Sequence, residues 1–241
     1  MKNVHLTLQG KGGVGKTLIA SLIAQYLMSK NEPLLVIDAD PVNSTLATFK
    51  NLNATTLSLI KEGGSTVSER NYDSLMTSIF DNDKHIVVDN GASSFLPLSN
   101  YLLSNEAIEM IEEKGKKVFI HTVITGGQGH RDTIAGFIAL ARQMPENANI
   151  VVWINEYFGK ISNKGLSFEK TKTYEEYKKR IFGMIILSKF PEDTFGADID
   201  KMLRAKLTFS EVEASDEFEI MAKSRLMKVK KAVFDQLVLL F

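Results

Sequence analysis

The fold of this 241-residue chain is decided by the stretch Gly10-Lys11-Gly12-Gly13-Val14-Gly15-Lys16-Thr17. A glycine, four further residues and then Gly-Lys-Thr make up the phosphate-loop pattern. The apolar run Val4–Leu8 precedes the stretch, and apolar residues follow it at the i, i+3, i+4 spacing of a helix. The pattern therefore lies between a predicted strand and a predicted helix, which is the context in which it binds phosphate.

Each residue type in this loop has a chemical reason to be there. The glycines allow tight turns that point backbone N–H groups inward, and the following helix adds the positive end of its dipole. We expect Lys16 to reach the β- and γ-phosphates and the Thr17 hydroxyl to bind Mg²⁺. A turn that only linked a strand to a helix would need neither side chain. The residues predicted to bind the nucleotide here are Gly12, Gly13, Val14, Gly15, Lys16, Thr17 and Leu18.

The composition excludes several other classes of protein. With no cysteine, the chain has no disulfide scaffold, no thiol nucleophile and no cysteine-ligated iron–sulfur cluster. Its 29 basic and 29 acidic side chains balance, which argues against wrapping nucleic acid over the whole surface. No apolar run approaches the roughly 20 residues of a membrane span. The N-terminus shows no export signal, so we expect a cytoplasmic protein.

Strand-like apolar runs alternate with helical patterns along the chain, which is typical of βαβ units. The sequence therefore predicts an α/β protein with one P-loop domain over residues 1–241 and a mostly parallel twisted sheet with helices on both faces. Helices are expected after Lys16, over Arg131–Gln143 and over Glu219–Leu240. The predicted strands are Val4–Leu8, Leu34–Ile37, His85–Val88, Lys117–Val123, Ile150–Ile154 and Phe182–Leu187.

Two other features of the sequence have structural interpretations. Seven basic and four acidic residues fall within Glu156–Arg180, which predicts an exposed loop followed by a solvated helix, with a functional insertion as the alternative. The histidines show no metal-ligand spacing, so we expect core or surface roles for His5, His85, His121 and His130.

Carboxylates stand at the ends of two predicted strands. Asp38-Ala39-Asp40-Pro41 follows the second strand, and alternate residues of a strand share a side, so Asp38 and Asp40 can both face the nucleotide. A capped turn is the alternative. The strand Ile86-Val87-Val88 ends at Asp89, which we expect to hold Mg²⁺ through water.

A second lysine at the start of the loop, Lys11, makes the motif a deviant Walker A signature, and the sequence resembles the ParA/MinD family of dimeric ATPases. The resemblance implies that Lys11 reaches across a dimer interface to the partner's nucleotide. It also implies that Asp40 positions the attacking water and that Asp38 supports the Mg²⁺ hydration shell. The resemblance further implies that Asn155 reads the adenine edge and that Pro191 packs beside the base.

The chain departs from that family's pattern in its switch loops. Val42 stands where the family has glutamine, and Asn90-Gly91-Ala92-Ser93-Ser94 replaces the usual Pro-Pro-Gly. These departures resemble the TraL-type proteins of conjugative plasmids, which implies a role in conjugal DNA transfer or in maintaining a mobile element. The strings that carry this resemblance are Gln9–Lys16, Asp40–Asn43, Asp89–Phe95, Thr125–Gln128 and Val151–Asn155.

The leading functional hypothesis is an ATP-driven dimerisation switch with slow hydrolysis, ATP and Mg²⁺ as ligands, and a protein partner that reads its state. Lys11, Lys16 and Asp40 would be its catalytic residues. One alternative is a small-molecule kinase on a phosphate-loop scaffold. Another is a nucleotide-dependent module that binds DNA or a membrane with negligible turnover, because Met221–Phe241 is a basic amphipathic helix. We expect that helix instead to be the last core helix of the domain.

Overall fold

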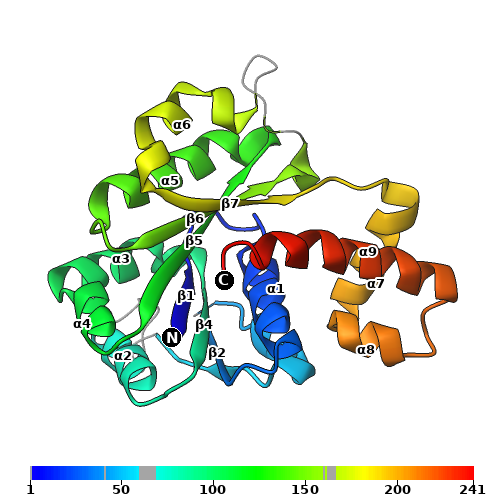
Figure 1. Cartoon of the computed structure of the whole chain (residues 1–241), viewed down its shortest axis with the longest axis horizontal. Helices are drawn as coiled ribbons and strands as arrows, with labels where there is room; N and C mark the ends of the chain where they lie inside the picture. The colour runs from blue at the N-terminus through cyan, green and yellow to red at the C-terminus, as the bar shows by residue number, and fades with distance from the viewer. Residues whose placement is uncertain (1, 41, 60–68, 160, 162–166) are drawn as a thin grey trace.

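The computed structural model describes residues 2–40, 42–59, 69–159, 161 and 167–241, so Pro41 lies outside the described part. A seven-stranded sheet runs through this part, in the order β3-β2-β4-β1-β5-β6-β7, with every neighbouring pair parallel (Figure 1). Its strands are β1 Asn3–Thr7, β2 Leu34–Ala39, β3 Thr55–Thr56, β4 His85–Asn90, β5 Lys117–Thr125, β6 Asn149–Asn155 and β7 Ile181–Leu187.

All six predicted strands are confirmed, and the structure adds one that was not predicted. β3 pairs with β2 only at Ile37 and Asp38, and both of its residues are exposed. Two residues are too few to show a period of alternation, which is why the sequence pattern did not reveal this edge strand.

Helices cover both faces of the sheet, as predicted (Figure 1). One core contains apolar side chains of α1, α8 and α9, and the other contains side chains of α2 to α6. Strands buried on both faces need apolar residues on both sides, which explains the continuous Val and Ile runs. The helices are α1 Lys16–Ser29, α2 Tyr72–Phe80, α3 Phe95–Ser104, α4 Ala107–Glu113, α5 His130–Gln143, α6 Lys172–Tyr177, α7 Ala197–Arg204, α8 Phe209–Ala214 and α9 Ile220–Leu237.

The last helix, α9, packs its apolar stripe into the core, as the sequence predicted. Leu226, Val229, Val233 and Leu237 are all buried, and the helix contacts α1 and β7. Because this face is occupied within the fold, it is not free to lie on another surface. Within the described residues, no helix is long and apolar enough to cross a membrane.

The charged segment over residues 156–180 differs in part from its prediction. Its described residues include α6, whose Tyr177 is buried, and Phe168, which is also buried. Both rings contact the Phe137 ring of α5 edge-on, with centroids 6.1 and 5.9 Å away. The predicted solvated helix is therefore solvated only on its charged side, since its aromatic side completes the core. Residues 160 and 162–166 lie outside the described residues.

Two buried histidines form a hydrogen-bonded row through the sheet. His5 Nδ1 lies 2.9 Å from His121 Nε2, and Trp153 donates its indole N–H to His121 Nδ1 at 2.9 Å. Both imidazoles are completely buried. Burial lowers the pKa of His121 to about 3. Burial, together with the repulsion that protonated His121 and His85 would exert, lowers the pKa of His5 well below its usual value. Both side chains are therefore neutral in the folded protein near pH 7.

This row predicts acid sensitivity of the fold. Below about pH 6.5 the unfolded chain binds protons at these histidines while the folded protein does not, so stability falls as pH falls. Within that pH range, each histidine lowers the free energy of unfolding by up to about 1.4 kcal/mol per pH unit. Thermal melting at pH 7 and pH 5 measures the slope. We expect a smaller slope in His121→Gln, whose amide can accept from Trp153 but does not titrate; an unchanged slope would contradict the assignment.

Candidate functional site

The phosphate loop connects β1 to α1, and its backbone adopts conformations that glycine allows more readily than other residues do. Gly13 and Gly15 have φ values of +73° and +104°, in the left-handed region that disfavours other residues. The first helical hydrogen bond of α1 runs from Ile19 N to Gly15 O at 3.0 Å. The N–H groups of the first helical turn, up to that of Leu18, therefore have no acceptor within the helix and are available to an anion. The side chains of Val14 and Leu18 pack into the core beside α1.

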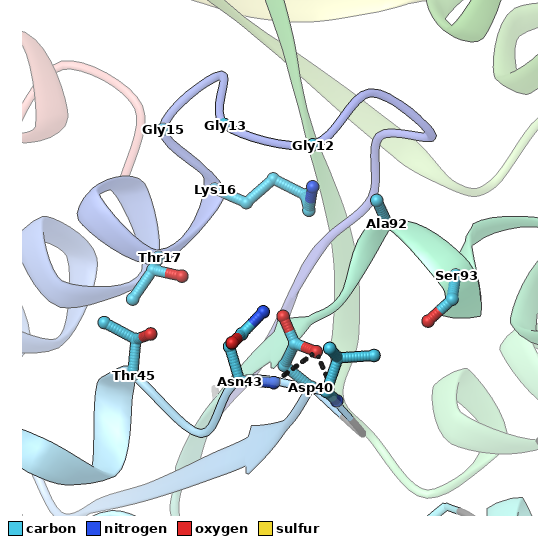
Figure 2. A pocket seen from close by; sticks show the side chains of 11 residues that line it. Gly12, Gly13, Gly15, Lys16, Thr17, Asp40, Asn43, Thr45, Ala92 and Ser93 are labelled. Atoms are coloured by element: carbon cyan, nitrogen blue, oxygen red, sulfur yellow. Dashed lines mark hydrogen bonds between the residues drawn. The ribbon is translucent and has the colours of Figure 1, made fainter. Parts of the chain in front are cut away.

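A cavity of about 620 Å³ opens at the carboxyl edge of the sheet, under the phosphate loop (Figure 2). It brings together the predicted Lys16, Thr17 and Asp40 with three loop glycines. The other lining residues belong to the segments after β2 and β4, and the sequence pattern predicted no binding role for them. The full lining is Gly12, Gly13, Gly15, Lys16, Thr17, Asp40, Val42, Asn43, Thr45, Ala92 and Ser93.

Lys16 is buried beneath the loop and extends under it toward the segment after β4 (Figure 2). Its ammonium donates to the backbone carbonyl of Lys11 at 3.0 Å. Burial lowers the pKa of Lys16, while the nearby carboxylates of Asp89 and Asp40 act in the opposite direction. The lysine thus supplies a cation in a poorly hydrated site, where its attraction for phosphate is strong.

Asp89 is the penultimate residue of β4, beside the phosphate loop, and is 1% exposed. Thr7 donates its hydroxyl to Asp89 Oδ1 at 3.1 Å, while no described residue hydrogen-bonds the buried Oδ2. Burial raises the pKa of Asp89 to about 6, although the nearby hydroxyls of Thr17 and Thr7 oppose the shift. A buried carboxylate oxygen without a partner, close to the Thr17 hydroxyl, is a donor set that suits a hydrated Mg²⁺ ion.

The two carboxylates after β2 have different environments. Asp38 is 1% exposed and does not line the cavity. Its Oδ1 accepts from Asp40 N at 3.2 Å, and its Oδ2 accepts from Ala47 N at 2.9 Å. Burial raises its pKa. Asp38 therefore holds the loop after β2 in shape, and its support of a metal hydration shell stays a prediction, whereas Asp40 lines the cavity itself.

The two residues predicted near the base do not line the cavity. Asn155 is buried at the end of β6, where its amide donates to Val14 O at 2.9 Å and accepts from Tyr157 N at 3.1 Å. In this arrangement Asn155 supports the phosphate loop, and adenine recognition by its side chain stays a prediction. Pro191 is exposed and accepts at its carbonyl from Gly196 N at 2.9 Å. Its place beside the base likewise stays a prediction.

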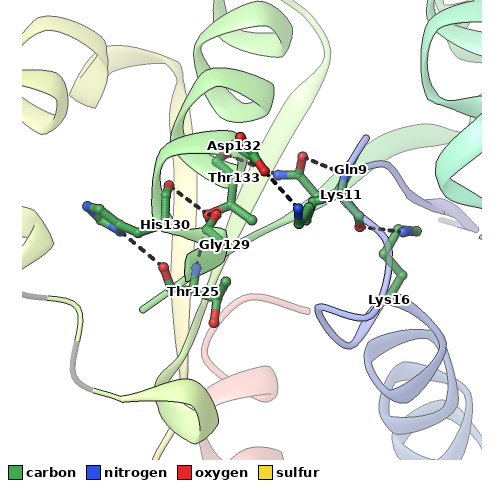
Figure 3. Close-up of polar contacts among 8 residues, drawn as sticks. All are labelled: Gln9, Lys11, Lys16, Thr125, Gly129, His130, Asp132 and Thr133. Atoms are coloured by element: carbon green, nitrogen blue, oxygen red, sulfur yellow. Dashed lines mark hydrogen bonds and ion pairs between the residues drawn. The ribbon is translucent and has the colours of Figure 1, made fainter. Parts of the chain in front are cut away.

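Lys11 is paired within its own chain (Figure 3). Its ammonium lies 2.8 Å from Asp132 Oδ2, in the first turn of α5, and the two side chains are 44% and 57% exposed. Gln9 also connects the phosphate loop to α5 and to β5, because its amide donates to Thr133 O at 3.1 Å and to Val123 O at 2.9 Å. No role for Gln9 or Asp132 was predicted from the sequence, although an acid near the start of a helix favours charge interactions there.

Comparison with known proteins agrees with this geometry. Residues 6–215 match the family model described as the CobQ/CobB/MinD/ParA nucleotide binding domain. The chain belongs to this family. The match includes the phosphate loop and both carboxylate strands, and nucleotide binding is the property that the family membership assigns.

Two relatives of this CobQ/CobB/MinD/ParA family member are similar over nearly the whole chain. They are both called Protein TraL, from Escherichia coli, and are 44% and 42% identical over 237 residues, covering 98% of this chain and 98% of each relative. A similar solved structure is the MinD cell division protein of Aquifex aeolicus, with a TM-score of 0.53 and 17% identity, covering 97% of each chain. At that identity the likeness to MinD shows the shared fold alone, and it confirms the predicted α/β architecture.

Proposed function

We propose that this protein is an ATP-driven dimerisation switch that hydrolyses ATP slowly. The observation that carries the proposal is the position of Lys11 in the phosphate loop, where its exposed ammonium forms a surface ion pair with Asp132. Exposed ion pairs contribute about 0–1 kcal/mol, so the lysine can exchange this partner for a phosphate at little cost. A second subunit facing the same cavity would offer that phosphate.

Residues that line the cavity would carry out ATP hydrolysis together with two that lie outside its lining, Asp89 and Lys11. Lys16 and the loop amides would bind the β- and γ-phosphates, and Asp40 would orient the attacking water. Thr17, and Asp89 through water, would hold Mg²⁺, which neutralises phosphate charge when it is bound. Lys11 of the partner subunit would stabilise the charge that develops on the transferring group.

The similarity to the TraL proteins supports a role in conjugal DNA transfer or plasmid maintenance, through a protein partner that binds the ATP-bound dimer. Retention of proteins from plasmid-bearing cells on ATP-loaded Asp40→Ala protein, compared with ADP-loaded wild type, tests this. A partner of the transfer or maintenance machinery retained only with ATP would support the role. Equal retention in both states would contradict it.

Of the two alternatives, the nucleotide-dependent module is disfavoured as a membrane binder, because the apolar stripe of α9 is buried in the core. A small-molecule kinase needs an acceptor, so hydrolysis of ATP by the purified protein without any added acceptor would distinguish the switch from it. ATP consumption that depended on an acceptor would favour the kinase.

Replacing Asp40 by alanine should permit ATP binding but slow hydrolysis by about 10²–10⁴-fold, the usual contribution of a group that handles the attacking water. Phosphate release in single-turnover experiments measures the rate, and nucleotide titration measures the affinity. The variant should therefore accumulate with ATP bound. Hydrolysis at the wild-type rate would move the role to another carboxylate.

A further inference from the structure

Gly91 occupies the first position of the loop after β4, where its backbone does not require glycine. Its φ of −64° and ψ of 159° are open to any L-residue. The space around it, however, leaves no room for a β-carbon while the Asp40 carboxylate stays in place. A β-carbon at this position would lie 2.5 Å from Asp40 Oδ1 and 2.7 Å from Asp40 Cγ, closer than real β-carbons come to other atoms. The missing side chain is therefore explained by the carboxylate that fills its place.

The sheet register brings these two residues together. β2 and β4 are neighbours with Ala39 opposite Asn90, so Asp40 and Gly91 are the next residues as both strands end. The Asp40 carboxylate cannot easily withdraw from this contact, because its Oδ1 also accepts N–H groups from its own loop. These come from Val42 at 2.9 Å and Asn43 at 3.1 Å. The carboxylate is thus confined between the amides of one loop and the α-carbon of the other.

We propose that Gly91 is a positioning residue for the Asp40 carboxylate. By lacking a side chain, it lets the loop after β4 close against Asp40 and hold its carboxylate at the wall of the cavity that Lys16 shares. The inference rests on the proposed function, in which Asp40 orients the attacking water. It adds that the two loops are sterically linked: a movement of the loop after β4 changes the space available to the Asp40 carboxylate.

The steric part of the proposal is tested without any nucleotide. Gly91→Ala should lower the melting temperature by about 2–4 °C, since one methyl group overpacks a filled site. In the Asp40→Ala background the same substitution should cause no such loss, because the shortened side chain leaves room for the methyl group. An equal loss in both backgrounds would overturn the proposal, because the methyl group would then be colliding with something else.

The functional part is tested by hydrolysis and binding together. Gly91→Ala should slow single-turnover hydrolysis by about 10²-fold, as displacement of a reacting group by about 1 Å can do. Its affinity for ATP should stay within about twofold of the wild type, because the phosphate loop is unchanged. In the Asp40→Ala background, Gly91→Ala should cause no further slowing.

Failure of this inference is distinguishable from failure of the proposed function. If Asp40→Ala hydrolyses ATP like the wild type, the role of Asp40 is wrong and the inference falls with it. If Asp40→Ala is slow but Gly91→Ala hydrolyses and melts like the wild type, the positioning role alone is overturned. A fall in ATP affinity that equals the fall in rate would also overturn it, since the methyl group would then be disturbing binding.

Discussion

Lys16→Ala should abolish productive ATP binding. Hydrogen bonds to charged groups contribute about 1.5–3 kcal/mol each, so losing the contacts of one lysine to two phosphates should weaken binding by about 10²-fold or more. The expected loss is large because Lys16 is buried, and a poorly hydrated cation attracts phosphate strongly. Titration with a fluorescent ATP analogue measures the affinity, and phosphate release measures turnover.

The fold should survive this substitution. Among the described residues, the Lys16 ammonium donates a hydrogen bond only to the Lys11 carbonyl. Burial lowers the pKa of Lys16, which means that keeping this side chain charged destabilises the folded state. Circular dichroism should therefore match the wild type. Lys114→Ala, which removes an exposed lysine at the end of α4, serves as the matched control and should bind ATP normally. Wild-type binding and hydrolysis in Lys16→Ala would refute the phosphate-loop assignment.

The parts of the site that could be predicted from the sequence are those whose function depends on local order. The phosphate loop needs its glycines, lysine and threonine at fixed spacing, because one turn and one helix end form the whole cradle. Asp40 and Asp89 could be found for a related reason, since carboxyl ends of parallel strands meet at one edge of the sheet. For these residues the chain order largely determines the position in space.

Contacts between distant segments could not be predicted in this way. Asp132 pairs with Lys11 and Gln9 binds Thr133 only because α5 packs beside the phosphate loop. Nothing near Asn155 in the sequence indicates that its amide donates a hydrogen bond to the Val14 carbonyl. Likewise, the many charges of residues 156–180 did not indicate that α6 has a buried aromatic side, because a count of charges does not show which face of a helix they occupy.

Lys11→Ala distinguishes action within one subunit from action across a dimer. If Lys11 acts in its own subunit, the variant should resemble a weaker form of Lys16→Ala and lose nucleotide affinity as a monomer. If it acts across a dimer, the monomer should still bind ATP, because Lys16 and the loop amides remain. The dimer should then fail to form, since two γ-phosphates would face each other without a cation between them. Hydrolysis should fall by about 10³–10⁵-fold, by analogy with arginine fingers.

Light scattering of the Asp40→Ala protein with ATP, with and without Lys11→Ala, measures directly whether the dimer forms. Asp132→Ala in the same background is the matched control, because it breaks the same 2.8 Å ion pair but leaves the lysine in place. We expect dimers of Asp40→Ala and of Asp40→Ala/Asp132→Ala, and monomers only when Lys11 is removed. If Asp132→Ala abolished the dimer as fully as Lys11→Ala does, the ion pair within the chain would be the active arrangement. Monomers in all three proteins, with full ATPase activity in the wild type, would refute the dimer mechanism.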